Sequence, residues 1–296
     1  MDFIFFGRPI LLIPVWTIYL HFLAVGSHDG GAVDLWTNLY GLAALTLIMM
    51  GAYVLNQIFD IETDRINDKL YFLPRGVISI RAAWIWYAVL TSGGLLIPLF
   101  FARASMISAI LIVVLGVLYS APGAKWKDLP VAGLLVNAAT FGFLVPACAA
   151  PGFVYTDLGR PAIPYFMAVT TAFVLTTIPD MAGDAATSKK TVAVALGPKR
   201  ALWLALVVAL LTVWTGVFIG NYEIGIVAGI TAVLIVILLI SFNSRLMLFT
   251  CKAPILLLTL MAAFHFPLYL VLLVLTIVLT RVYYKTRFGI IYPRLS

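Results

Sequence analysis

The chain has 296 residues, of which 63% are hydrophobic and only 10% are charged, whereas a soluble domain carries roughly 25% charged residues. This composition excludes a soluble globular protein, because too little polar surface is available to face water. The net charge of +7 is spread too thinly for a nucleic-acid-binding surface, and Cys148 and Cys251 give no disulfide framework and no metal-ligand spacing.

Apolar runs long enough to cross a hydrocarbon layer of about 30 Å recur along the whole chain. Helices are predicted, because open strands cannot satisfy their backbone groups in lipid and no alternating barrel pattern is present. Nine spans are expected, at residues 9–25, 35–56, 82–100, 103–120, 129–150, 161–179, 201–219, 222–242 and 254–281. The last run is long for one crossing and contains Pro267, so we expect a kink or a break there.

The loop charges predict an orientation. With the N-terminus in the cytoplasm, thirteen Lys and Arg residues fall on the inner side, and only Arg103 and Arg160 fall outside, as the positive-inside rule requires. The C-terminal tail departs from this pattern, since nine spans would send its basic residues outside: Arg281, Lys285, Arg287 and Arg294. Either the tail tolerates this or the number of spans is off by one. No linker or soluble segment interrupts the chain, so residues 1–296 are predicted to form one membrane domain.

Two acidic motifs stand at helix ends on the predicted inner side. Asn56, Asp60 and Asp64 follow the second span at intervals of four residues, and Asp180 and Asp184 repeat that interval after the sixth span. Residues four apart share one helix face, where like charges repel. Carboxylate and amide oxygens suit Mg²⁺, which binds one or two carboxylates together with substrate phosphate oxygens.

Nearby cations extend this interpretation. Lys125, Lys127, Lys189 and Lys190 lie on the same side and could neutralise the phosphate oxygens that the metal ions do not reach. Solvated or salt-bridged polar helix ends are the alternative for each pair taken alone. Two equivalent pairs on one side favour a metal-diphosphate site.

The ordered set of motifs resembles the UbiA-type intramembrane prenyltransferase superfamily over nearly the whole chain. Members of that superfamily have nine membrane helices, a first motif of form NxxxDxxxD and a second of form DxxxD or DxxGD. Asn56, Asp60 and Asp64 match the first motif, and Asp180, Gly183 and Asp184 match the second. Shorter matches follow at the family's spacing, namely Arg8-Pro9, Leu73-Pro74, Tyr119-Ser120-Ala121-Pro122, Lys190-Thr191-Val192 and Leu196-Gly197.

The departures from the family pattern also carry information. Gln57 replaces a frequent aspartate, and together with Glu62 it is most similar to the branch that prenylates homogentisate and other quinone precursors. Tyr71 and Thr177 stand where relatives often place basic residues. These changes leave the expected metal ligands intact and put the residues that contact diphosphate in question.

The resemblance implies an all-α bundle around a central cavity that opens near the cytoplasmic face. It implies Mg²⁺-dependent transfer of a polyprenyl group from its diphosphate to a small acceptor, with an aromatic one favoured, in lipid-quinone or related isoprenoid-lipid biosynthesis. Related enzymes use aromatic acids, homogentisate-like quinone precursors, chlorophyllide-like tetrapyrroles and glycerol phosphate ethers, so the acceptor stays open. The ligands would be Asn56, Asp60, Asp64, Asp180 and Asp184, the four aspartates being catalytic. The substrate-binding residues would be Lys125, Lys127, Lys190, Lys69 and Arg75 at the diphosphate, Tyr119 at the developing cation, Arg8 at an anionic acceptor group and Asn137 facing the cavity.

Other functions remain open on the sequence. A membrane terpene cyclase would use the same metal site without an acceptor, an ion-coupled transporter would use the carboxylates as ion sites, and an inactive scaffold would need neither. His21 and His265 lie in apolar runs, where we expect hydrogen-bonded helix packing. The expected location is the cytoplasmic membrane with the active site toward the cytoplasm, and neither nucleic acid nor a protein partner is expected.

Overall fold

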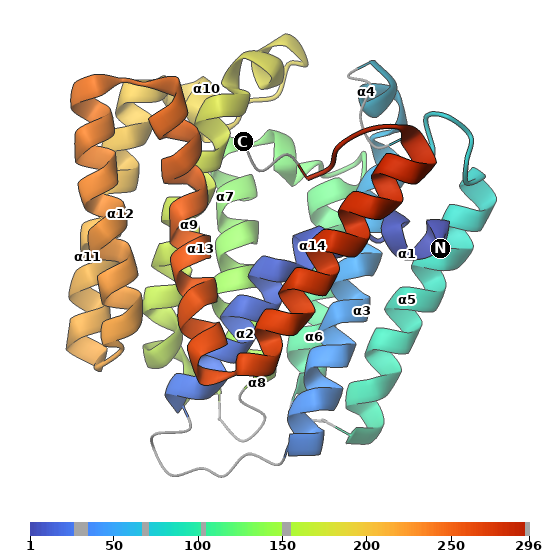
Figure 1. The fold of residues 1–296 in the computed structure, drawn as a ribbon, viewed down its shortest axis with the longest axis horizontal. Coiled ribbons are helices and arrows are strands. Elements are labelled where there is room, and N and C mark those ends of the chain that lie inside the picture. The colour runs from blue at the N-terminus through green and yellow to red at the C-terminus, as the bar shows by residue number, and fades with distance from the viewer. Residues whose placement is uncertain (27–34, 67–70, 102–104, 150–154, 294–296) are drawn as a thin grey trace.

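A computed structural model describes residues 1–26, 35–66, 71–101, 105–149 and 155–293 (Figure 1). These residues form helices and their connections, with no strand among them. The long helices are α2 (Leu12–Gly26), α3 (Leu35–Phe59), α5 (Ile80–Phe101), α9 (Tyr155–Ala186), α11 (Pro198–Ile219), α12 (Tyr222–Ser241), α13 (Ser244–His265) and α14 (Pro267–Phe288). One further span is built from α7 (Pro130–Ala139), the π-helical turn η5 (Thr140–Leu144) and α8 (Val145–Ala149).

Nine helical segments of the described chain are long and apolar enough to cross a membrane, which confirms the predicted polytopic all-α fold. The set differs from the prediction in two places. In the predicted span 103–120, the described residues form a shorter helix, α6 (Met106–Ser120). Residues 254–281 belong to two helices, α13 and α14. The helix is interrupted at Phe266, because Pro267 has no backbone N–H to continue α13.

Short helices gather at one end of the bundle. Figure 1 shows α4 (Ile61–Ile66) and α10 (Val192–Leu196) at this end, with α11 and α12 along one edge of the bundle and α3 and α5 along the other. We call the end of the bundle that holds α4 and α10 the polar end. The helix η1 (Pro9–Leu11) precedes α2, and η4 (Trp126–Asp128) precedes α7.

The N-terminal helix contacts the C-terminal end of α14. The Asp2 carboxylate, in the short helix α1 (Asp2–Phe6), accepts hydrogen bonds from the Tyr283 hydroxyl (2.6 Å) and from Arg287 Nη2 (3.1 Å). The basic C-terminal end of α14 therefore lies beside the N-terminus. The predicted spans placed these two ends on opposite sides of the membrane. The division of residues 254–281 between α13 and α14 brings them to the same side of the bundle.

A close backbone contact fixes the middle of the bundle. A methyl group on Gly142, in η5, would stand 2.4 Å from the Phe166 Cα atom and 2.7 Å from its backbone nitrogen in α9. Membrane helices use small residues where backbones approach this closely. Thr140 and Phe141 in the same turn line the cavity described below, so the contact also positions cavity residues.

The substitution Gly142→Ala is expected to destabilise the protein, since backbone atoms on two elements must move apart. Overpacking of this kind costs about 1–3 kcal/mol. Thermal unfolding in detergent should show a lower midpoint for this variant than for Gly159→Ala, whose new methyl group meets no atom within 4 Å. Equal midpoints for the two variants would contradict the close contact.

Candidate active site

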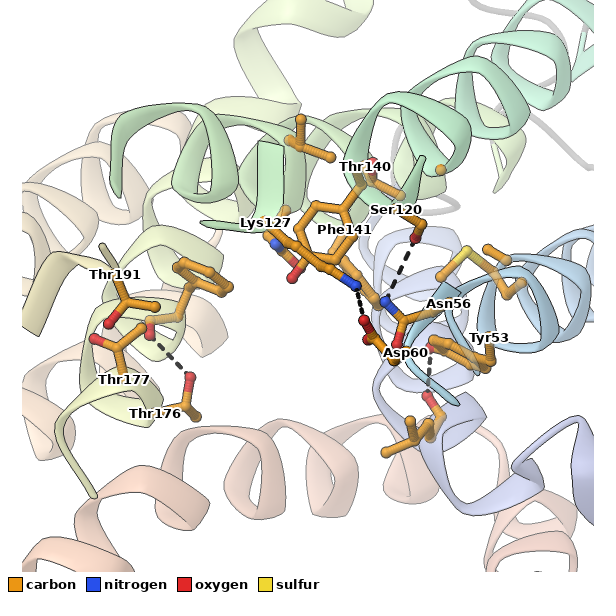
Figure 2. Close-up of a pocket in the computed structure, with 18 of the residues that line it drawn as sticks. Tyr53, Asn56, Asp60, Ser120, Lys127, Thr140, Phe141, Thr176, Thr177 and Thr191 are labelled. Carbon is orange, nitrogen blue, oxygen red and sulfur yellow. Dashed lines mark hydrogen bonds and ion pairs between the residues drawn. The ribbon is translucent and has the colours of Figure 1, made fainter. Parts of the chain in front are cut away.

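A cavity of about 370 Å³ opens among the helices at the polar end. It takes residues from the ends of α3, α6 and α9, from α7 and η5, and from the segments beside α2 and α10. Figure 2 shows two of its walls, with Asn56 and Asp60 on one side and Thr176 and Thr177 on the other. Both aspartate motifs contribute to its lining, so one cavity brings together residues 120 positions apart in the sequence.

Eight of the thirteen candidate site residues line this cavity: Arg8, Asn56, Asp60, Tyr119, Lys127, Asn137, Asp180 and Asp184. Asp64 is buried close behind Asp60. Lys125, Lys190 and Arg75 are exposed and do not line it. Lys69 lies outside the described residues. Lys189, predicted only as a neighbouring cation, lines the cavity in place of Lys190.

The first motif keeps helical geometry past the end of α3. The Asp60 backbone N–H donates to the Asn56 carbonyl (3.0 Å), and the Asp64 N–H donates to the Asp60 carbonyl (2.8 Å). These bonds hold the three side chains at the spacing of successive helical turns. The Asp60 carboxylate forms an ion pair with Lys127 Nζ at 2.5 Å, in which the two side chains are 17% and 8% exposed.

Asn56 lies between this ion pair and α6. In one orientation its amide nitrogen donates to Ser120 Oγ (3.4 Å), as Figure 2 shows. Rotated by half a turn, the amide nitrogen donates to Asp60 Oδ2 (3.2 Å) and the amide oxygen accepts from Lys127 Nζ (3.2 Å). The second orientation satisfies both ends of the amide, so Asn56 aligns the carboxylate and the ammonium group.

Asp64 is the carboxylate whose environment most requires a cation. It is buried, and no described residue donates to its Oδ2 atom. Burial, together with the neighbouring Asp60 carboxylate, raises the pKa of Asp64 to about 6, against the opposing effect of Arg8, Lys127 and Lys189. A buried acceptor oxygen without a donor is costly, and a bound divalent cation would satisfy it.

Gln57 points away from the cavity. Its Nε2 atom donates to the Phe6 carbonyl (2.8 Å) and to the Tyr53 carbonyl (3.1 Å). Gln57, which replaces an aspartate that is frequent in the family, therefore attaches α3 to the N-terminal segment that carries Arg8. The Arg8 Nε atom is buried and meets no acceptor among the described residues, which leaves it available to an anionic group in the cavity.

The second motif comes from the end of α9, where Asp180 is exposed and Asp184 half-buried. The chain turns immediately afterwards. The Lys189 N–H donates to the Asp184 carbonyl (2.9 Å), and the Lys190 N–H donates to the carbonyl of Asp128, the last residue of η4 (3.0 Å). This turn directs Lys189 to the cavity and leaves Lys190 outside.

Three residues with a left-handed backbone conformation lie at the turns that position the basic side chains of the cavity. Arg8 has φ 54°, Lys125 has φ 42° and precedes Lys127, and Ser188 has φ 61° and precedes Lys189. Non-glycine residues rarely adopt this conformation, and such strain concentrates at functional sites. The turns explain why Lys127 and Lys189, and not Lys125 and Lys190, line the cavity.

The two adjacent lysines are expected to differ in their effect on catalysis. Lys189→Ala should lower turnover by about 10–100-fold, because a cation at the cavity wall is lost. Lys190→Ala should change turnover by less than about twofold, since exposed charges interact weakly. Initial rates for the two variants, measured side by side, check this ordering, and a larger loss in Lys190→Ala would reverse the assignment.

The aromatic residues close to the aspartate motifs and to Lys127 also differ, since only some of them line the cavity. Tyr53 and Tyr119 line the cavity, where the Tyr53 hydroxyl donates to the Leu11 carbonyl (2.9 Å). Phe59 packs edge-on against Trp84 with ring centres 5.8 Å apart, and neither Phe59 nor Trp126 lines this cavity. The first two rings are thus the ones available to a substrate.

The donor set fits Mg²⁺ with phosphate, and not a closed protein cage. Within the described ranges, no three acidic, histidine or cysteine side chains lie close enough to hold a metal ion. The first motif places Asp60 in the cavity wall with Asp64 buried behind it, and the second places both Asp180 and Asp184 in the wall. Mg²⁺ usually binds through one or two carboxylates and completes its coordination with phosphate oxygens and water, so a diphosphate between the walls would complete both sites.

Residues 12–252 match the family model described as the UbiA prenyltransferase family. The chain belongs to this family. Digeranylgeranylglyceryl phosphate synthase of Thermococcus kodakarensis is 32% identical over 186 residues, which cover 62% of this chain and 65% of that enzyme. A probable homogentisate phytyltransferase of Oryza sativa is 28% identical over 197 residues, covering 62% of this chain and 48% of that protein. The matched stretches thus span less than two thirds of these relatives' own lengths.

The fold also matches solved family members. A UbiA homologue from Archaeoglobus fulgidus, whose structure was solved with DMAPP and Mg²⁺ bound, superposes with a TM-score of 0.66 at 20% identity. The match covers 87% of this chain and 99% of the homologue. The protein is therefore a multi-pass UbiA-family membrane protein with the prenyltransferase fold.

Proposed function

We propose that this UbiA-family protein transfers a prenyl group from its diphosphate to an acceptor that carries an anionic group, with Mg²⁺ as cofactor. The observation that carries the proposal is the cavity itself. Two aspartate motifs and three cations, Arg8, Lys127 and Lys189, line or border one polar pocket, which adjoins a second, apolar cavity. A diphosphate with a hydrocarbon tail has the same division into a charged head and an apolar chain.

Bound Mg²⁺ would neutralise the charge that develops on the departing diphosphate. Asn56, Asp60, Asp64, Asp180 and Asp184 would hold it. Lys127 and Lys189 donate to the phosphate oxygens and stabilise the same charge. As the allylic C–O bond breaks, its electron pair leaves with the diphosphate; the acceptor's nucleophilic atom then bonds to that carbon and releases its proton.

The remaining cavity residues protect the electron-deficient carbon. The faces of Tyr53 and Tyr119 can stabilise positive charge, and Leu11, Ile112 and Phe141 supply apolar surface around them. Water would convert the allylic cation to an alcohol, so its exclusion is part of the chemistry. The apolar lining below the aspartates serves that purpose.

Arg8 is proposed to bind the acceptor. Its buried Nε atom faces no protein acceptor in the described structure, and a guanidinium group binds carboxylate or phosphate through paired hydrogen bonds. A glycerophosphate ether is the first candidate, supported by the likeness to the archaeal synthase. An aromatic quinone precursor with a carboxylate is the second, supported by the Asn56-Gln57 pair and by the likeness to the rice protein.

The polar end is proposed to face the cytoplasm. Basic residues of the loops and of the first helical turns gather there, including Lys125, Lys190, Lys199, Arg200 and Arg245, and the basic end of α14 joins them. Cytoplasmic loops of membrane proteins carry such an excess. A prokaryotic cytoplasmic membrane is the simplest location for this arrangement.

An acceptor panel tests the proposal. Purified protein in lipid nanodiscs would receive Mg²⁺ and labelled geranylgeranyl diphosphate, with geranylgeranylglyceryl phosphate, homogentisate, 4-hydroxybenzoate or no acceptor. We expect diphosphate release and a labelled product with one anionic acceptor, and neither in EDTA. A cyclised hydrocarbon without acceptor would indicate a cyclase instead. Substrate uptake into liposomes without turnover would indicate a transporter.

A further inference from the structure

A second cavity of about 330 Å³ lies below the aspartate cavity, toward the opposite end of the bundle. Both cavities are lined by the same six residues at their junction: Leu11, Tyr53, Asn137, Phe141, Phe173 and Thr176. Below the junction the lining is apolar, and its far end is formed by Ile18, Tyr165 and Ile224. The pair of cavities thus extends from the metal-binding motifs to Tyr165.

One face of α9 runs along the full length of both cavities. Its lining residues follow the three-and-four spacing of a helical stripe, at Tyr165, Ala168, Val169, Ala172, Phe173, Thr176, Thr177, Asp180 and Asp184. Tyr165 and Asp180 are 180 − 165 = 15 residues apart. A helix rises about 1.5 Å per residue, so they are separated by about 22 Å along the axis.

The Tyr165 ring is held in place from behind by a polar network. Its hydroxyl lies 2.6 Å from His21 Nδ1 and accepts from Asn221 Nδ2 at 3.2 Å. His21 Nε2 lies 3.0 Å from Glu223 Oε2, and His265 Nε2 lies 2.8 Å from Glu223 Oε1. His21 is fully buried and Tyr165 is 1% exposed.

The network is internally complete. With Nε2–H of both histidines donating to Glu223, Nδ1 of a neutral His21 accepts the Tyr165 hydroxyl hydrogen. The ring of Phe22 packs against Tyr165 with centres 5.3 Å apart. Moving the phenol would leave buried polar groups without partners in an apolar region, which is unfavourable. The histidines thus have the hydrogen-bonded packing role predicted from the sequence, and they also make Tyr165 a rigid wall.

We propose that Tyr165, held by the His21–Glu223–His265 network, is the end wall of the prenyl site and sets the longest chain that the protein accepts. The proposal rests on the proposed function. An extended chain advances about 3.3–3.6 Å per three backbone bonds, or about 4.5–5 Å for the four bonds of an isoprene unit. Of the roughly 22 Å available, the diphosphate takes about 5 Å on the same scale. The remainder holds three to four isoprene units, a C15 to C20 chain.

Competition among C10, C15, C20, C25 and C30 diphosphates measures the chain-length profile. We expect the wild type to prefer C15 or C20 and to discriminate against C25. Tyr165→Ala should raise the C25-to-C20 ratio about tenfold, the low end of what a changed apolar pocket achieves. Ala168→Phe should shift the preference to shorter chains, and Ala172→Phe, one turn nearer the aspartates, should shift it further.

Three controls separate this effect from general damage. Tyr165→Phe keeps the ring but loses the bonds to His21 and Asn221, so it should keep the preference for C15 or C20 and shift the C25-to-C20 ratio much less than Tyr165→Ala does. Tyr19→Ala removes a phenol that is equally buried but bonds to the Asn38 carbonyl outside both cavities, so it should leave the profile unchanged. Displacement of a fluorescent prenyl diphosphate ranks the chain lengths by affinity and needs no turnover. If Tyr165→Ala does not fold, Ala168→Phe and Ala172→Phe still test the proposal.

The outcomes distinguish the two proposals. An active wild type whose profile is the same in Tyr165→Ala, Ala168→Phe and Ala172→Phe would overturn the end wall alone. A wild type that neither binds nor consumes any prenyl diphosphate would overturn the proposed function, and the end wall with it. We expect Tyr165→Ala to shift the preference to longer chains and the two phenylalanine variants to shift it to shorter ones. The shift to shorter chains should be larger for Ala172→Phe than for Ala168→Phe.

Discussion

Asp60→Asn and Asp180→Asn are each expected to lower prenyl transfer by at least about 10²–10³-fold, the loss that follows removal of one preorganised group that stabilises transition-state charge. The two residues line opposite walls of one cavity, and each amide would replace a charged metal ligand with a neutral one. Because the shape of the side chain is retained, the protein should still fold. Initial rates across a range of Mg²⁺ concentrations measure the effect, which should include a weaker response to the metal.

Glu62→Gln is the matched control for these two variants. Glu62 lies between Asp60 and Asp64 in the sequence, but its side chain is 77% exposed and pairs with Arg65 at 2.9 Å. The same carboxylate-to-amide change there should leave the rate within about twofold, since exposed ion pairs contribute little. Near-wild-type turnover in Asp60→Asn or Asp180→Asn would remove that aspartate from the metal site.

Lys127→Ala is expected to cost about 10²-fold in turnover, while Lys125→Ala stays within about twofold of the wild type. Lys127 is 8% exposed and pairs with Asp60 at 2.5 Å, so its ammonium group lies within reach of a diphosphate bound at that aspartate. Lys125 is exposed outside the cavity. Rates and the apparent affinity for prenyl diphosphate, measured on both variants, check the difference.

Thermal unfolding separates a loss of stability in Lys127→Ala from a loss of turnover. Removing Lys127 leaves the Asp60 carboxylate without its ion-pair partner, so some loss of stability is expected in the absence of Mg²⁺. Saturating Mg²⁺ should restore the unfolding midpoint but not the rate. A rate that recovers fully with Mg²⁺ would show that Lys127 only neutralises Asp60 and does not contact the diphosphate.

The spans and the aspartate motifs could be predicted from the sequence, because both are periodic. Apolar runs report helices directly in lipid, and the four-residue spacing of Asn56, Asp60 and Asp64 places them on one face even where α3 ends. The break at Pro267 was also visible. Its consequence was missed: two helices in place of one long span reverse the direction of the chain and bring Arg287 beside Asp2.

The choice between neighbouring lysines could not be predicted from spacing. Lys127 reaches the cavity because Lys125 adopts a left-handed backbone conformation, and Lys189 does so because Ser188 adopts one. Glycine would have signalled such a turn, but lysine and serine do not. The geometry of the turn, and not the charge pattern, decides which ammonium group faces the site.

The hydrogen-bond network that holds Tyr165 could not be predicted from the sequence, for a different reason. His21, Glu223 and His265 come from three helices, α2, α12 and α13, and are at least 42 residues apart in the sequence. Each alone is one polar residue in an apolar run or at a helix end. Polar residues at membrane depth are paired or functional, which supports a packing role but does not name the partner. Their convergence on one tyrosine depends on how α2, α9, α12 and α13 pack, which a single sequence does not specify.

Equilibrium binding of a non-reacting C20 prenyl thiodiphosphate, measured with and without Mg²⁺, tests the central claim most directly, namely that the two aspartate motifs jointly hold a diphosphate through metal ions. Saturating Mg²⁺ should tighten binding at least about 100-fold, a coupling of about 2.7 kcal/mol, and Asp60→Asn or Asp180→Asn should each remove most of that gain. Equal affinity in Mg²⁺ and in EDTA, or an Mg²⁺ effect that survives both substitutions, would contradict it.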